Sequence, residues 1–532
     1  MSAGCTGALR GGVLHLTLDS RGSSVNVFSP AVALELEKEL QSGLAAGARA
    51  VVLRSGKRGS FVNGVGLLLA ASSHDEGAAM ERARTLQRCY ERLASAPVPT
   101  VAAISGNCYG CGLELALTCD YRLAADGYDT HFYMPELRDY AFIPLFGGTQ
   151  RLPRLLGLRQ GMRLLLGERI GAGEAARVGL VDRLAPKADL DRELRSFLRD
   201  LGARGWPKRT LAVPRPSAPE PLETLPGPER PLAEEALRLA RLPSSPGYRL
   251  EDGLRRELEG FWRSVGSQQS TRAMSFFFVR QAAKAHAIGS ASYARPERLT
   301  LAAQPRSPAL RKLSKLLRER RLPGIELRAR GPIAFAAKKV RGSFTCVLGP
   351  PGSGGECAAC LLFPEEQIPV IELVPPSPSR PWRRGAALFQ VLEQAGFAPV
   401  VTRARGRFVS ERLITAFRDA VGGHPARDAL LGFGFRLPRA LRQRVAPGAE
   451  EGAADRLVQA LARECVRALD EGELTHPSQA DLLAHALFGF PVIHGGLLRY
   501  AAEGASPIAP AAARALGRAV RRSASGSEPQ GP

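Results

Sequence analysis

Short apolar runs and longer amphipathic segments alternate over the first 190 or so residues of this chain. Runs with the length and alternation of strands lie at residues 13–18, 50–53 and 98–104. Apolar residues at helical spacing predict helices at about residues 30–44 and 78–93. Ser29 suits the N-cap of the first helix, and Pro30 suits its first turn. Strands that alternate with helices predict an α/β unit.

The pattern changes in the second half of the chain. Proline crowds residues 206–231, which predicts a linker or an extended surface segment. A helical pattern returns from Leu254 to Ala285. Strand-like runs follow at 345–348 and 370–374, and from about residue 382 the pattern is mainly helical. We divide the chain into six parts, at residues 1–190, 191–290, 291–376, 377–445, 446–522 and 523–532, the last a polar tail that we expect to be disordered.

Composition sets broad limits on the kind of protein. The 532 residues are 45% hydrophobic and 23% charged, which is ordinary for globular chains of three or four domains. No apolar run approaches the roughly 18 residues of a membrane span, and the first twelve residues lack the apolar core of a secretory signal. The nine cysteines are scattered without the spacing of a zinc site. These features predict a cytoplasmic protein with free thiols and no metal.

The net charge of +22 raises the question of a nucleic-acid partner. The arginines are spread along the chain, and an aromatic content of 6% offers no stacking platform. We therefore expect no nucleic acid as a partner. The same positive field suits an anionic, phosphorylated substrate.

Two glutamates lie in segments that suit acid–base chemistry. Glu114 follows a glycine-rich turn within residues 105–116, where the first amides of a helix lack internal acceptors. Glu136 lies in Met134–Leu137, shortly before a second glycine-rich segment at 147–154. Two carboxyls can divide the removal and the supply of a proton between them. The alternative is that Glu114 is a charge on a helix surface and Glu136 a capping residue.

Three segments in the same order resemble the crotonase (enoyl-CoA hydratase/isomerase) superfamily: residues 59–66, 105–116 and 175–182. The resemblance implies an α/β crotonase fold, a ββα spiral, over residues 1–190. It implies that the backbone N–H groups of Val65 and Cys111 hold the oxygen of a thioester enolate, with turns supported by Gly64, Gly110 and Gly112. It also implies that Glu114 and Glu136 hold and activate the attacking water, and the presence of both favours hydration.

The chain departs from this family at both enolate-binding positions. Val65 and Gly66 replace an alanine and an aspartate of the family pattern, which predicts a different fit of the acyl chain. Cys111 stands where the family has glycine. A Cβ at this position either crowds the thioester or conflicts with a positive φ, and this predicts a tuned or reduced activity.

The rest of the chain resembles the 3-hydroxyacyl-CoA dehydrogenase part of the fused fatty-oxidation α subunit. The segments that carry this resemblance lie at residues 368–372, 399–410, 476–481 and 489–500. It implies a truncated Rossmann-like segment at 291–376, followed by two mainly α-helical dehydrogenase-like domains. Residues 191–290 would hold the linker and the connecting helices.

The dehydrogenase chemistry is missing from this second half. No Gly-x-Gly-x-x-Gly turn, which a dinucleotide pyrophosphate requires, lies between residues 290 and 348. By resemblance, Cys360 replaces the hydride-transfer histidine beside Glu372, and Ser410 replaces an asparagine. A thiol does not replace an imidazole that must cycle its proton near neutral pH. We expect neither NAD nor another cofactor.

These observations predict an enzyme that hydrates a 2-enoyl thioester of CoA, or of an acyl carrier, in fatty-acid metabolism. The resemblance implies a thiolase or a second copy of the chain as a partner. Three alternatives stay open: double-bond isomerisation or other enolate chemistry, a non-catalytic scaffold of an acyl-processing complex, and a bifunctional hydratase and dehydrogenase.

Overall fold

The chain divides into two compact units, each described here by itself. Unit 1 contains Met1–Leu225 and Glu229–Thr271, and unit 2 contains Pro226–Pro228 and Arg272–Pro532. The six-part division made from the sequence stays a prediction. The computed structural model describes residues 4–23, 25–57, 59–64, 76–127, 129–209, 230–288, 298–303, 325–329, 343–348, 357–362, 370–375, 389, 392–393, 397–504 and 507–524.

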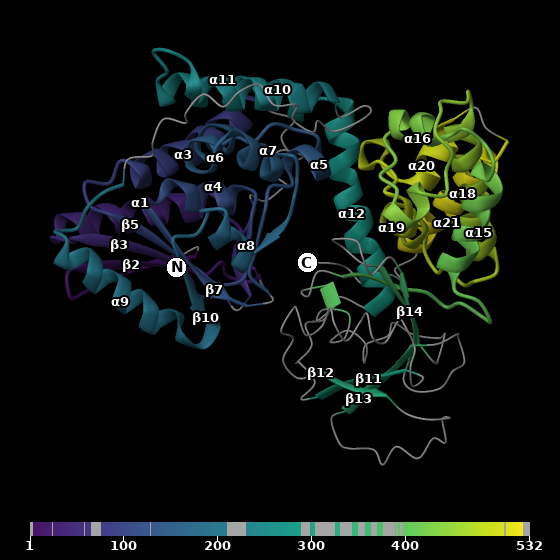
Figure 1. The fold of residues 1–532 in the computed structure, drawn as a ribbon, viewed down its shortest axis with the longest axis horizontal. Helices are drawn as coiled ribbons and strands as arrows, with labels where there is room; N and C mark the ends of the chain where they lie inside the picture. The colour runs from purple at the N-terminus through teal and green to yellow at the C-terminus, as the bar shows by residue number, and fades with distance from the viewer. Residues whose placement is uncertain are drawn as a thin grey trace. The chain divides into compact units, whose positions relative to one another are not determined.

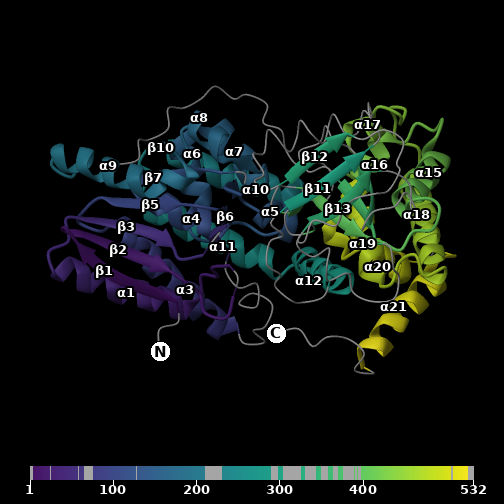
Figure 2. The ribbon, with the colours of Figure 1, turned by 90° about the horizontal axis from the view of Figure 1, so that it is seen from below.

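Unit 1 is built on a six-stranded sheet in the order β1-β2-β3-β5-β7-β10 (Figures 1 and 2). Its strands are β1 (Cys5–Arg10), β2 (Val13–Leu18), β3 (Ala50–Ser55), β5 (Thr100–Ile104), β7 (Tyr121–Asp126) and β10 (Arg183–Pro186). The first two form an antiparallel hairpin, and all later neighbours are parallel. Gly11 and Gly12 make the hairpin turn with positive φ, which glycine adopts without strain. The strands predicted at 13–18, 50–53 and 98–104 are confirmed as β2, β3 and β5.

A second, small sheet has the order β4-β6-β8-β9. Its members are β4 (Ser60–Asn63), β6 (Asn107–Tyr109), β8 (His131–Tyr133) and β9 (Ile170–Gly171). The first three are parallel, and β9 is antiparallel to β8. Strands of two to four residues leave no periodic signal, and the sequence pattern did not predict this sheet.

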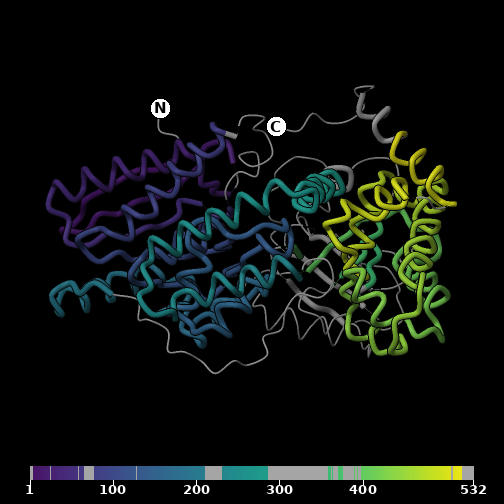
Figure 3. The backbone as a smooth tube through the Cα atoms, turned by 90° about the horizontal axis from the view of Figure 1, so that it is seen from above, coloured from purple at the N-terminus to yellow at the C-terminus, as the bar shows by residue number. Residues whose placement is uncertain are grey.

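Helices cover both faces of the larger sheet. The helices of unit 1 are α1 (Pro30–Ala45), α3 (Glu76–Ala94), α4 (Cys111–Thr118), α5 (Glu136–Tyr140), α6 (Gly148–Leu156), α7 (Leu158–Leu165), α8 (Ala172–Arg177), α9 (Leu190–Ala203), α10 (Arg230–Arg241) and α11 (Leu250–Val265), with 3₁₀ turns at Lys187–Asp189 and Leu242–Ser244. As predicted, Ser29 caps α1 by accepting from the N–H of Val32. The helices α1 and α3 lie side by side (Figures 2 and 3). On the other face, α9 packs Leu194, Phe197, Leu198 and Leu201 against the core residues of β3 and β5.

The helical pattern predicted from Leu254 to Ala285 is confirmed, and the structure divides it into two helices. The chain forms α11 and then α12 (Gln268–Ile288), with α11 ending at Gly266. Ser267 begins the next helix, because its Oγ accepts from the N–H of Ser270 at 3.1 Å. In unit 1, α10 packs against α6 and α7, and α11 packs against α6 (Figure 1).

Unit 2 contains a six-stranded sheet and a group of helices. The sheet has the order β12-β11-β13-β14-β15-β16, in which only β14 and β15 pair antiparallel. Its strands are β11 (Arg298–Ala303), β12 (Ile325–Ala329), β13 (Ser343–Leu348), β14 (Cys357–Leu362), β15 (Val370–Val374) and β16 (Ala398–Val401). The helices are α15 (Val409–Val421), α16 (Arg427–Phe433), α17 (Arg439–Arg442), α18 (Ala453–Asp470), α19 (Pro477–Phe488), α20 (Leu497–Glu503) and α21 (Ala509–Ala524), with a 3₁₀ turn at Val492–His494. Predominant helix after residue 382 is confirmed.

The core of unit 2 joins β15 and β16 to these helices. Phe417 of α15 stacks on Phe488 of α19 with ring centroids 5.3 Å apart. Leu457 and Leu461 of α18 are fully buried in the same cluster. Within the described ranges of both units, no helix combines the length and the apolar character that crossing a bilayer requires.

Candidate active site

Three chain segments leave the small sheet at the same edge. The parallel register pairs Asn63 with Tyr109 and Tyr109 with Tyr133, which are the last residues of β4, β6 and β8. Because parallel strands end at one edge, the segments that follow them lie together. These segments begin with Gly64, with Gly110 and with the loop to Glu136. The small sheet therefore brings together regions that are far apart in the sequence.

The glycine-rich turn before α4 takes the form that the sequence predicts. Gly110 has φ 54° and ψ −123°, and α4 begins at Cys111. A Cβ at Gly112 would lie 2.3 Å from the carbonyl oxygen of Val62, so only glycine allows α4 to approach β4 this closely. The positive φ falls at Gly110, and Cys111 is absent from the positive-φ residues of the described chain. The expected conflict between Cys111 and the backbone is therefore wrong.

The N-cap residue of α4 is Gly110, which offers no side-chain acceptor to the first amides of the helix. The carbonyl oxygen of Cys111 accepts a hydrogen bond from the hydroxyl of Tyr90 on α3 at 2.7 Å, which fixes the peptide at the start of α4. Tyr90 is buried and stacks on Phe146 at 4.6 Å. Burial raises the pKa of the Cys111 thiol well above its usual range, so the thiol is neutral. Val65, the second predicted donor, lies outside the described residues.

Glu114 points into the protein from the first turn of α4. Its side chain is 1% exposed, so the alternative of a surface charge is wrong. Its Oε1 accepts from the N–H of Phe146 at 2.9 Å and of Gly148 at 2.8 Å. These two donors favour the ionised form of the carboxyl and oppose the effect of burial, which favours the neutral form.

Glu136 is the first residue of α5 and is 7% exposed. A Cβ built on Gly110 would lie 2.5 Å from its Oε1, so the carboxyl lies against the start of α4. No group in the described chain hydrogen-bonds to its Oε2, although that atom is buried. A buried polar atom without a partner is uncommon and indicates a place where a bound molecule completes the hydrogen bonding.

A third buried carboxyl, Glu257 of α11, belongs to the same cluster. It is 0% exposed, and its charge acts on both Glu114 and Glu136. The sequence analysis missed it. Gly253, Glu257, Gly260, Phe261 and Val265 form the buried stripe of α11. A glutamate on such a stripe is the signal that was available, because a carboxyl is rarely buried without a specific partner.

Burial and mutual repulsion keep these three carboxyls from ionising together. Burial, followed by the charges of Glu257 and Glu136, raises the pKa of Glu114 well above its usual range. Burial raises the pKa of Glu136 to about 8 and that of Glu257 to about 7. The guanidinium of Arg151 is buried nearby and lowers the pKa of Glu257. Near neutral pH the cluster therefore retains protons, and it can both donate and accept one.

The three positions predicted in unit 2 also come together. Cys360 of β14 is the register partner of Glu372 of β15. Glu372 is fully buried, and its carboxyl accepts from both the N–H and the hydroxyl of Ser410. It also accepts from the hydroxyl of Thr402 at 2.6 Å and the N–H of Val409 at 3.0 Å. Four donors occupy this carboxyl, which holds the first turn of α15.

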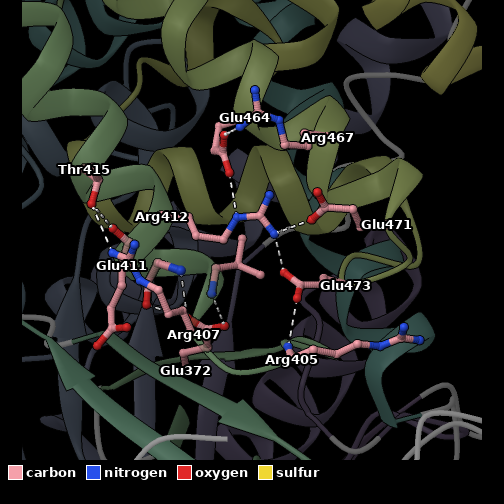
Figure 4. Close-up of polar contacts among 12 residues, drawn as sticks. Glu372, Arg405, Arg407, Glu411, Arg412, Thr415, Glu464, Arg467, Glu471 and Glu473 are labelled. Carbon is pink, nitrogen blue, oxygen red and sulfur yellow. Dashed lines mark hydrogen bonds and ion pairs between the residues drawn. The ribbon is translucent and has the colours of Figure 1, made fainter.

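A network of ion pairs around Arg412 of α15 lies near Glu372 of β15 (Figure 4). Arg412 reaches Glu464 of α18 at 2.6 Å and also pairs with Glu471 and Glu473. Glu473 in turn accepts from the N–H of Arg405 at 2.8 Å. The network ties α15 to α18 and to the loop that follows it. Within the described ranges, no group of three or more His, Cys, Asp or Glu side chains is placed to hold a metal ion.

Comparison with known proteins connects unit 1 to one family. Residues 9–207 match the model of the enoyl-CoA hydratase/isomerase family. The fatty acid oxidation complex subunit alpha of Aliivibrio fischeri is 34% identical over 203 residues, which are 36% of this chain and 29% of that protein. The subunit of the same name from Vibrio campbellii is 38% identical over 183 residues, 34% of this chain and 25% of that protein. The chain thus matches less than a third of the length of these relatives.

Among solved structures, the crystal structure of an enoyl-CoA hydratase from Bacillus halodurans is 21% identical. The match covers 51% of this chain and 98% of the hydratase chain, with a TM-score of 0.40. The family match spans β1 to α9 and includes Glu114, Glu136 and the turn at Gly110. The N-terminal part of this chain, residues 9–207, is thus similar to the enoyl-CoA hydratase/isomerase family.

Proposed function

We propose that unit 1 adds water to the double bond of a 2-enoyl thioester, carried by CoA or by an acyl carrier, to give the 3-hydroxyacyl thioester. The observation that carries this proposal is the pair of buried carboxyls beside the uncapped start of α4. Glu136 presents an oxygen without a described partner, and Glu114 is held by two amides. The match of residues 9–207 to the hydratase/isomerase family supports the same chemistry.

The two carboxyls take different roles in this proposal. We assign the base to Glu114, because two amides orient its carboxyl and favour its ionised form against the rise in pKa that burial causes. Glu136, with a pKa of about 8, is the acid. Glu114 takes a proton from the water molecule while the oxygen of that water bonds to the β-carbon. Glu136 gives a proton to the α-carbon. The step balances, because one water molecule is added in all. Glu136 then recovers its proton from Glu114.

Negative charge collects on the thioester oxygen during this addition. The N–H of Cys111 points from the free end of α4, where the helix dipole also favours an anion. Such donors stabilise an enolate because they are already oriented, and loss of one typically costs about 10²–10³-fold in rate. The resemblance assigns the second donor to Val65.

The test is the loss of the absorbance of the conjugated thioester when the purified protein is mixed with crotonyl-CoA. We expect Glu114→Gln and Glu136→Gln each to lower kcat by about 10²–10⁴-fold. Glu91→Gln, on the exposed side of α3, is the matched control and should leave the rate unchanged. Equal rates in all three variants would refute the two-carboxyl mechanism.

Isomerisation is the second candidate within the same family. It needs one carboxyl to move a single proton, whereas hydration uses two. Mixing the protein with a 3-enoyl-CoA distinguishes the two reactions. An isomerase forms the conjugated 2-enoyl product, and only one of the two Glu→Gln variants stops it.

We further propose that unit 2 is a dehydrogenase-like scaffold without NAD chemistry. Parallel strands around β11 and β13 agree with a truncated Rossmann-like segment. Glu372 is engaged by Ser410, Thr402 and Val409, and its strand partner is Cys360. Reduction of NAD by a 3-hydroxyacyl-CoA in the presence of the protein would overturn this proposal and would favour the bifunctional alternative.

A further inference from the structure

The loop that binds Glu114 is held from its other side by Glu257. The carboxyl of Glu257 accepts from the N–H of Gly147 and, at 2.8 Å, from the N–H of Thr149. It also accepts from the Thr149 hydroxyl. The amides of Phe146 and Gly148 bind Glu114. Four consecutive amides therefore alternate between two carboxyls, one on α4 and one on α11.

Because the same turn binds both carboxyls, the position of Glu114 depends on that of Glu257. The amides that bind Glu114 belong to a turn in which Gly147 has φ 99°. That turn precedes α6, and the first amides of a helix need external acceptors. Glu257 provides those acceptors and leaves the other two amides directed at Glu114. Arg151 closes the turn by donating to the carbonyl of Phe146 at 2.8 Å.

The rest of α11 follows the same loop. The N–H of Ile143 donates to the hydroxyl of Ser264 at 3.0 Å. The ring of Phe142 meets that of Phe261 edge-on, with centroids 5.4 Å apart. Glu257 is therefore the charged member of a helix that contacts the loop from residue 142 to residue 149. The matched family segment ends at residue 207, so α11 lies beyond it.

We propose that Glu257 is a positioning residue for the hydration reaction: by holding the amides of Gly147 and Thr149, it orients the turn that binds and orients Glu114. The inference rests on the proposed function of Glu114 as the base. It assigns to the segment after the family domain a part in the active site. Glu257 itself touches no reacting atom in this account.

The charge of Glu257 gives the proposal a signature that a purely structural role lacks. The titratable groups that act on Glu114 are Glu257 from α11 and Glu136 from α5, and Arg151 of α6 also faces it. Tyr90 and Cys111 lie next to it and are neutral. A neighbouring negative charge raises the pKa of a carboxyl, so removal of that charge must lower it. Above about pH 7, where Glu257 ionises, this effect is present.

Two variants test the charge of Glu257 and the contact of its carboxyl with the turn. Glu257→Gln removes the charge and replaces one of the two accepting oxygens with an NH2 group, so one side of the turn is released. We expect the whole pH–rate profile for crotonyl-CoA to move to lower pH by about one unit, with a lower kcat as well. Glu257→Asp keeps the charge and withdraws the carboxyl from the turn. We expect kcat to fall by up to about 10²-fold, while KM stays nearly constant and the pH–rate profile does not move along the pH axis. Glu259→Gln, exposed on the same helix, is the control and should match the wild type.

A second measurement needs no substrate and separates this inference from the proposed function. The infrared carbonyl band of protonated Glu114, identified by its loss in Glu114→Gln, is followed against pH in the wild type and in Glu257→Gln. We expect its midpoint to fall in the variant, whether or not the protein hydrates crotonyl-CoA. An unchanged midpoint together with an unchanged pH–rate profile would overturn the positioning role. An inactive wild type with a shifted midpoint would refute the hydratase proposal alone.

Discussion

Replacement of Glu136 by glutamine is expected to stabilise unit 1 at alkaline pH. Burial raises the pKa of Glu136 from 4.5 to about 8 in the folded protein. Between these two values the folded state keeps a proton that the unfolded state has lost. Stability from this group is therefore complete below about pH 4.5 and is lost as pH rises to about 8. Glutamine cannot ionise, so the variant lacks this loss.

The size of the effect follows from the shift. Each pH unit between the two pKa values costs about 1.4 kcal/mol of the free energy of unfolding. From pH 6 to pH 9 the wild type should lose about 3 kcal/mol through Glu136, since the loss stops near pH 8. The drop in Glu136→Gln should be smaller by about that amount. A residue proposed to act in catalysis would thus be retained at a cost in stability.

Urea unfolding followed by tryptophan fluorescence can measure this in unit 1. Of the three tryptophans, Trp206 and Trp262 belong to unit 1 and Trp382 to unit 2. A Trp382→Phe background therefore restricts the signal to unit 1. Glu91→Gln in the same background is the control for an exposed carboxyl. If the wild type and Glu136→Gln lose the same free energy between pH 6 and pH 9, Glu136 is not held protonated and the reasoning fails.

Three further changes test the geometry. Gly110→Ala should abolish hydration and destabilise unit 1, because its Cβ would lie 2.5 Å from Glu136 Oε1 at a φ of 54°; a rate assay on folded protein checks this, and normal activity would contradict it. Cys111→Gly should leave the rate within a few-fold, because Cys111 carries no backbone strain, and should cost about 0.5–1 kcal/mol in urea unfolding; a large gain in rate would show that the thiol crowds the substrate. Glu372→Ala should leave four donors unsatisfied and lower the stability of unit 2 by several kcal/mol, at about 1–3 kcal/mol per buried group. Hydrogen exchange of α15 measures that loss, with the exposed Glu451→Ala as control, and unchanged protection would refute the capping role.

Local sequence signals were sufficient for three of the six strands of the larger sheet and for the glycine turn of the site. Strands β2, β3 and β5 each carry an apolar run, and Ser29 and Pro30 mark the beginning of α1. Gly110 and Gly112 predict the turn before α4 because only glycine meets its backbone and packing requirements. Such features depend on residues that are neighbours in the chain, so a single sequence contains them.

The sequence by itself determined the α/β alternation of unit 1, the position of the glycine turn, and the pair Glu114 and Glu136 as candidates. Only the tertiary structure decided which carboxyls are buried together. The small sheet joins short strands across the chain, and Glu257 reaches Gly147 from 110 residues away. A pKa depends on burial and on charges nearby in space, and sequence spacing specifies neither. The same reason explains why Glu257 was missed while Glu114 was found.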